Sequence, residues 1–151
     1  MQWKPNVTVA AIAEKDGCFL IVEEEADNQI VFNQPAGHLE NSETLFEAVK
    51  REVLEETAWE FIPKSIVGIY MYPNIHSDII YLRVCFSGNC TIHFPERKLD
   101  EGIIRATWMN RKELEYHREK LRSPMVLNCI DDYLAGKQYP LDLLNHFLPK
   151  I

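Results

Sequence analysis

The chain has 151 residues, of which 46% are hydrophobic and 11% are aromatic. This length fits one domain and this composition can bury a core, so an intrinsically disordered chain is excluded. The formal net charge of −7 argues against a broad nucleic-acid footprint and against an anionic membrane surface as the main partner. An anionic substrate would need a cation between itself and the protein.

The four cysteines (Cys18, Cys85, Cys90 and Cys129) form no C-x-x-C pair and accompany no histidine cluster. They predict reduced thiols in a cytoplasmic protein rather than a zinc site. The N-terminus lacks a basic-then-apolar signal pattern, and no run approaches the ~18 apolar residues of a membrane span. We therefore expect one cytoplasmic domain over residues 1–151, as a monomer or a small homo-oligomer.

The first elements in chain order are strands. Val7–Ala13 and Cys18–Glu24 are rich in β-branched and apolar residues, and Asp16-Gly17 between them tolerates the positive φ of a tight turn. These features predict a β-hairpin. A short strand is predicted around Ile30–Asn33, after which the proline and glycine of residues 34–37 interrupt regular pairing.

After a central helix, strands and helices alternate. Strands are predicted at Ile66–Tyr72, Ile79–Phe86 and Gly102–Met109, with a weaker candidate at Thr91–Phe94. A helix is predicted from the N-cap Asn110 to about Lys120, and another after Ser123-Pro124, closed by Gly136. This pattern indicates a single α+β or mixed α/β domain.

The central helix is predicted to begin near Ser42 or Glu43 and to end at about Thr57. Its core-facing stripe is apolar in the first half, at Leu45, Ala48, Val49 and Val53. In the second half, Glu52 and Glu56 fall inside the same stripe and Glu55 falls on its edge. A solvated acidic face would instead place the acids opposite the apolar residues.

Acids on the buried side of a helix carry two costs. Glu52 and Glu56 repel each other at i, i+4, and desolvation near a core adds to that repulsion. A bound cation removes both costs, and clustered hard oxygen ligands suit Mg²⁺ or Mn²⁺. A divalent-metal site is therefore predicted, with a buried salt-bridge network as the alternative.

The segment "GHLENSETLFEAVKREVLEETAW" resembles the Nudix box, a glycine and a set of acids at fixed spacings. The residues in register are Gly37, Glu43, Arg51, Glu52, Val53, Glu55, Glu56 and Trp59. Ala58 departs from the pattern, because the family has glycine just past the helix. If φ is positive there, alanine costs on the order of 1 kcal/mol.

Similarity beyond the box, in "NQPAGHLE" and "LDEGIIRATWM", looks like the NudJ-type phosphatase subgroup. The resemblance implies an α/β/α sandwich, a mixed β-sheet between helices. It also implies hydrolysis of phosphoanhydride bonds in nucleoside tri- or diphosphates or small pyrophosphates, such as hydroxymethylpyrimidine pyrophosphate. The expected partner is this small-molecule substrate, without nucleic acid or membrane.

The metal ligands expected from the helix are Glu52, Glu55 and Glu56, and the resemblance adds the carbonyl of Gly37. Mg²⁺, or Mn²⁺ in its place, would bridge the acids and the phosphates and lower the pKa of a water molecule. Glu52 or Glu56 would accept that proton, and the sequence does not choose between them.

The supporting residues expected from the resemblance are Arg51 and Glu43, as an ion pair that braces the loop and the helix. Glu47 is also spaced to compete for Arg51. Asp100 and Glu101 lie where relatives often place another acid, although a solvated loop tip is an equal interpretation.

Three cationic or polar side chains are candidates for substrate contact. Arg83 and Arg105 lie on predicted strands and could meet phosphates, and His38 follows Gly37 at the entry to the helix. Each has a plain alternative as a solvated side chain.

Other functions stay open at this point. One is a Nudix pyrophosphohydrolase for ADP-ribose, dinucleotides or damaged nucleotides. Another is a non-catalytic Nudix-fold nucleotide-binding module, and a third is capped-RNA processing, which the net charge disfavours.

Overall fold

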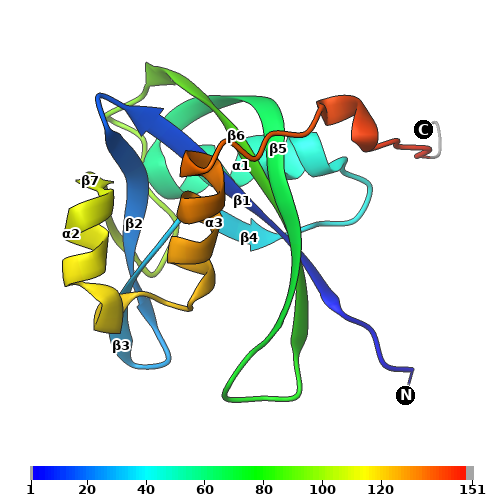
Figure 1. Ribbon diagram of the computed structural model, residues 1–151, viewed down its shortest axis with the longest axis horizontal. Helices are drawn as coiled ribbons and strands as arrows, with labels where there is room; N and C mark the ends of the chain where they lie inside the picture. The colour runs from blue at the N-terminus through cyan, green and yellow to red at the C-terminus, as the bar shows by residue number, and fades with distance from the viewer. Residues whose placement is uncertain (1, 149–151) are drawn as a thin grey trace.

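The computed structural model describes residues 2–148, in which one mixed seven-stranded sheet lies between helices (Figure 1). The hydrogen-bonded order is β3-β2-β1-β6-β5, with β4 paired to β1 and β7 paired to β2. The strands are β1 (Asn6–Lys15), β2 (Cys18–Ala26), β3 (Gln29–Asn33), β4 (Ala36–His38), β5 (Trp59–Pro73), β6 (Ile80–His93) and β7 (Ile103–Asn110). The helices are α1 (Leu45–Thr57), α2 (Arg111–Tyr116) and α3 (Met125–Leu134), with 3₁₀ turns at Arg118–Lys120 and Leu141–Leu143.

Strand β1 lies at the centre and is buried on both faces. It runs parallel to β6 and antiparallel to β4. Because successive side chains alternate between the faces of a sheet, Val9 and Ala11 join the core under α1, whereas Ala10 and Ile12 join the core under α3. The two helices thus cover opposite faces (Figure 1), and the predicted α/β/α sandwich is confirmed.

The predicted hairpin is also present, and two strands are longer than the sequence indicated. Asp16 and Gly17 form the turn with φ values of 52° and 79°. β5 begins at Trp59, and β6 continues to His93, where two separate strands were expected. Polar residues break the apolar pattern of β6, but the strand stays paired with β5 along its length, with irregularities in register at three places.

Helix boundaries differ from the prediction for local reasons. Helix α1 begins at Leu45, rather than near Ser42 or Glu43, because Thr44 is the N-cap; the Thr44 side chain accepts from the N–H of Glu47. Glu47 completes this capping box by accepting from the N–H of Thr44. α2 ends at Tyr116, and a 3₁₀ turn completes the segment to Lys120 that was predicted as helix.

Residues 34–37 were expected to interrupt pairing, yet Ala36–His38 forms β4 against β1. No helix within residues 2–148 has the length and apolar character needed to cross a membrane.

Ala58 ends α1 in the left-handed region, with φ 62° and ψ 21°. We expect Ala58→Gly to raise the unfolding free energy by about 0.5 kcal/mol, because relief of a ~1–2 kcal/mol steric cost exceeds the loss of a buried methyl and the added chain entropy. Ala135 ends α3 with φ −74°, so Ala135→Gly should instead destabilise the protein. Urea unfolding of both variants measures the change in unfolding free energy that each glycine causes. A change of the same sign in both variants would contradict the strain at Ala58.

Candidate active site

The buried face of α1 combines apolar and acidic residues. Ala48, Val49 and Val53 pack in the core beneath the sheet. One turn further along the same face, Glu52 and Glu56 are only 9% and 8% exposed. Glu55 is half-buried at the edge of this face. The predicted placement of the three acids relative to the apolar stripe is confirmed.

The backbone of β4 touches these carboxylates. A Cβ atom added to Gly37 would lie 2.1 Å from Glu52 Cδ, so a side chain there would displace the Glu52 carboxylate. The N–H of Ala36 donates to Glu56 Oε1 at 2.9 Å. β4 therefore brings a strand backbone and two buried acids into one site.

Arg51 links the helix to the preceding loop and to β4. Its Nε and Nη2 donate to the two carboxylate oxygens of Glu43 at 3.0 and 2.7 Å, a bidentate ion pair. Nη2 also donates to the carbonyl of His38 at 3.0 Å. Nη1 donates to Glu52 Oε1 at 2.7 Å and to Glu55 Oε1 at 3.3 Å. A single guanidinium thus holds three elements together.

The charges of the site are not balanced by this guanidinium. Its hydrogen bonds lower the pKa of Glu43, whereas burial raises the pKa of Glu52 despite Arg51. Burial raises the pKa of Glu56 to about 9, and Glu52 adds to this effect. Within residues 2–148, no basic side chain forms an ion pair with Glu56. The salt-bridge alternative therefore accounts for Glu43, Glu52 and Glu55 but not for Glu56.

Two further acids face this cluster. The charges of Glu24 and Asp100 both raise the pKa of Glu56. The N–H of Asp100 donates to the carbonyl of Glu55 at 2.9 Å, which fixes the loop before β7 against the end of α1. Glu24 is buried on β2 and ion-paired to Arg122. Glu24 was not predicted, because nothing in the run of three glutamates at residues 23–25 distinguishes it.

The donor set fits a hard divalent cation in its chemistry. Glu52, Glu55, Glu56 and the Gly37 carbonyl offer only oxygen, and Glu56 is buried without a counter-charge. Across residues 2–148, however, no three His, Cys, Asp or Glu side chains already converge as metal ligands. Arg51 holds Glu52 and Glu55, and the backbone of Ala36 holds Glu56. Metal binding thus stays a prediction.

Of the three predicted substrate residues, His38 and Arg83 lie on the strands that flank β1, both in register with Thr8, and Arg105 lies on β7. The His38 carbonyl belongs to the Arg51 network, while its imidazole lies 6.4 Å from the Tyr81 ring. Arg83 is 3% exposed and contacts Gln34. Arg105 is an exposed residue of β7, 3.6 Å from Glu23. The described contacts bring neither arginine to the carboxylates of α1.

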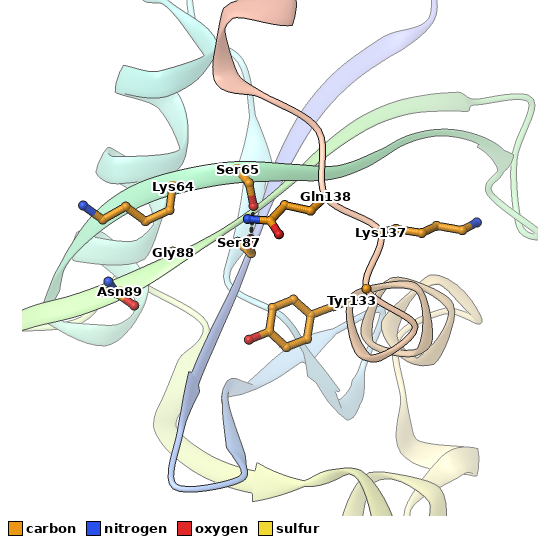
Figure 2. Close-up of a pocket in the computed structure, with 9 residues that line it drawn as sticks. Lys64, Ser65, Ser87, Gly88, Asn89, Tyr133, Lys137 and Gln138 are labelled. Atoms are coloured by element: carbon orange, nitrogen blue, oxygen red, sulfur yellow. Dashed lines mark hydrogen bonds between the residues drawn. The ribbon is translucent and has the colours of Figure 1, made fainter.

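A cavity of about 230 Å³ lies elsewhere, between the β5–β6 ladder and the segment that follows α3 (Figure 2). The hydroxyls of Ser65 and Ser87 lie 2.5 Å apart at its wall. Lys64 and Lys137 border it, but Figure 2 shows their side chains directed away from the serines. None of the predicted site residues lines this cavity, and no charged group converges in it.

Comparisons with known proteins agree with the motif. Residues 3–127 match the family described as NUDIX domain. The chain is 36% identical over 146 residues to "Phosphatase NudJ" of Escherichia coli strain K12, covering 96% of this chain and 94% of the relative. It also resembles the solved NUDIX hydrolase from Nitrosomonas europaea, with 48% identity, a TM-score of 0.93, and coverage of 95% of this chain and 98% of that chain. The MutT protein from Methanosarcina mazei Go1 shares the fold at 22% identity, with a TM-score of 0.72 and coverage of 91% and 99%.

Proposed function

Because this chain belongs to the NUDIX family, whose members are hydrolases of phosphoanhydride bonds, we propose that it is a Mg²⁺-dependent phosphatase of nucleoside tri- and diphosphates or similar small pyrophosphates. Its similarity to the curated NudJ phosphatases over nearly its whole length supports a NudJ-like phosphatase activity. The resemblance of its motifs to that subgroup adds hydroxymethylpyrimidine pyrophosphate as a proposed substrate. The four cysteines, free in the described residues, suit a cytoplasmic location.

One observation carries the proposal. Two carboxylates sit on the buried side of α1 and a third, Glu55, sits at its edge; Arg51 contacts Glu52 and Glu55 but not Glu56. A structural network would give every buried acid a partner charge, since an unpaired buried charge is costly. The unpaired Glu56 therefore supports a place for a further cation.

Each residue has a role in this proposal. Glu52, Glu55 and Glu56, with the Gly37 carbonyl, hold Mg²⁺; Mn²⁺ would serve as a substitute. Bound there, the metal would offset the charge of the phosphates and lower the pKa of a water molecule.

Glu52 or Glu56 accepts the proton of that water. Arg51 and Glu43 keep the loop, β4 and α1 in register, so they act by positioning the carboxylates. Among the substrate candidates, His38 is the last residue of β4 and is exposed, so its side chain is available to a substrate bound there.

We expect EDTA to abolish hydrolysis and added Mg²⁺ or Mn²⁺ to restore it. Phosphate and pyrophosphate should be assayed separately on nucleoside triphosphates, nucleoside diphosphates, hydroxymethylpyrimidine pyrophosphate and ADP-ribose. Phosphate and a nucleoside diphosphate, without pyrophosphate, are the expected products from a triphosphate. Undiminished hydrolysis in EDTA would contradict the metal mechanism.

The product analysis also separates the alternatives. Pyrophosphate with a nucleoside monophosphate, or rapid cleavage of ADP-ribose, would assign the chain to the pyrophosphohydrolases. Tight nucleotide binding without turnover would identify a binding module.

A further inference from the structure

The sheet face beneath α3 carries a row of polar and aromatic side chains that the proposed chemistry does not use. Across four strands, His38, Thr8, Arg83 and Tyr70 are register neighbours. Because side chains of register partners project to the same face, this row lies together on one side of the sheet. Tyr72 follows Tyr70 by two residues and shares this face.

Helix α3 covers only part of this row. Gln34 donates to the carbonyl of Val126 on α3, and Arg83 donates to Gln34 and, at 3.8 Å, to Cys129 Sγ. Beyond the N-terminal end of α3, the β5–β6 hairpin extends further without a covering helix (Figure 1). Arg83 therefore contacts Cys129 of α3 and also the ring of Tyr72, which lies nearer the end of the β5–β6 hairpin.

Three rings line the uncovered part. The ring centroids of Tyr72 and Tyr81 are 5.3 Å apart, and the imidazole of His38 lies 6.4 Å from Tyr81. Both tyrosines are half-buried and His38 is exposed. The guanidinium of Arg83 lies 5.6 Å from the centre of the Tyr72 ring. A cluster of tilted aromatic rings thus ends at a buried cation.

Two polar groups at this end of the cluster have no partner among residues 2–148. They are Nε of Arg83, a side chain only 3% exposed, and Oγ1 of Thr8, which is 7% exposed. Both are donors, and a buried donor without an acceptor is costly. Thr8 and Arg83 are direct register partners on adjacent strands, so the two unmet donors lie near each other.

The missing partner is an acceptor rather than a counter-ion. Arg83 already faces the Sγ of Cys129, whose pKa is lowered to about 7 by a hydrogen bond from Cys85 and by the charge of Arg83. A thiolate at Cys129 would offset the guanidinium charge. A neutral ring nitrogen or carbonyl oxygen would meet the remaining Nε–H and the hydroxyl of Thr8.

This surface and the carboxylate site meet at β4. A side chain at position 37 would point toward Glu52. The side chains of its neighbours, Ala36 and His38, project to the opposite face of the sheet. β4 has only β1 as a partner strand, so a molecule can lie across it. A substrate with its phosphates at α1 could therefore extend to the aromatic surface.

We propose that Tyr72, Tyr81 and Arg83 recognise the heteroaromatic ring to which the phosphates of the substrate are attached. The ring stacks on the tyrosines, and an acceptor on its edge takes hydrogen bonds from Arg83 Nε and Thr8. This inference rests on the proposed function, which places the phosphates of the substrate at α1. It assigns recognition of the ring to the face of the sheet opposite α1.

The test compares a substrate with a ring and one without. Tyr72→Leu should lower kcat/KM for ATP and CTP by about tenfold, mainly through KM, because base–aromatic stacking is worth ~1–3 kcal/mol. Hydrolysis of inorganic tripolyphosphate should be unchanged. Tyr72→Phe should retain activity on all three, and Tyr116→Leu, on the 85% exposed Tyr116 of α2, is the matched control. Equal effects of Tyr72→Leu on ATP and tripolyphosphate, or none, would overturn the proposal.

A second measurement leaves buried Arg83 unaltered. In ¹H–¹⁵N spectra of the wild-type protein, the Arg83 Nε–H signal, identified by its contacts with Tyr72 ring protons, should shift on adding millimolar cytidine or adenosine. An unshifted signal would remove Arg83 from the ring site. If the wild type hydrolyses neither ATP nor tripolyphosphate, the phosphatase proposal fails, whereas the nucleoside titration still decides the ring site.

Discussion

Glu56→Gln is expected to keep the fold and to lower kcat/KM for phosphate release by at least tenfold, which corresponds to ~1.4 kcal/mol of barrier or more. The amide oxygen of glutamine can still accept from the N–H of Ala36, so the local structure is kept. The change removes an anionic oxygen, and a neutral amide is a weaker ligand for a hard cation. Glu55→Gln should act in the same direction.

Glu47→Gln is the matched control on the same helix. Glu47 is exposed and belongs to the capping box, and glutamine also fits that position of the box. Its activity should equal that of the wild type. Near-normal turnover of both Glu55→Gln and Glu56→Gln at saturating Mg²⁺ would show that other residues bind the metal.

The metal-free protein should lose stability as pH rises, and Mg²⁺ should restore it. The pKa of Glu56 is about 9 in the folded protein and about 4.5 when unperturbed. Between these values the folded state keeps a proton that the unfolded state has released, so unfolding free energy falls with increasing pH. Mg²⁺ that binds only the folded protein adds about 2.7 kcal/mol at a hundredfold excess over Kd, or roughly 5–10 °C in Tm.

Melting curves of wild type and Glu56→Gln, at pH 6 and pH 9 with and without Mg²⁺, test this linkage. Without metal, the variant should melt slightly above the wild type at pH 9, because it carries no buried charge there. Its Mg²⁺-induced shift should be smaller. A metal-free variant melting well below wild type, with an unchanged Mg²⁺ shift, would mean that Glu56 is a structural ion-pair partner.

The residues of α1 were predictable because a helix places side chains by a fixed period. Once Val49 and Val53 define the core side, the positions of Glu52 and Glu56 follow, and the structure places both on that side. The hairpin at Asp16-Gly17 was predictable for a similar reason, since its φ values require residues that tolerate the left-handed region.

Contacts between segments distant in sequence were not predictable in this way. β4 is three residues long, and its pairing with β1 depends on register rather than on its own pattern. The bond from Ala36 to Glu56 depends on that pairing. Likewise, nothing in the sequence distinguishes Arg83 from any other arginine on a strand. It is buried because Gln34 and α3 pack on the same face of the sheet.

The parallel pairing of β1 with β6 sets the order in which this protein can fold. Loop, β4 and α1 are close in sequence, and the Arg51 contacts that join them span short stretches of chain. Thr8 and Arg83, in contrast, become neighbours only when the chain between them closes into a loop that contains most of the first half of the sequence. Long-range pairing of this kind slows folding because the entropy of closure is lost before the contacts form. Formation of the sheet centre, rather than assembly of the acidic helix, should therefore limit the folding rate.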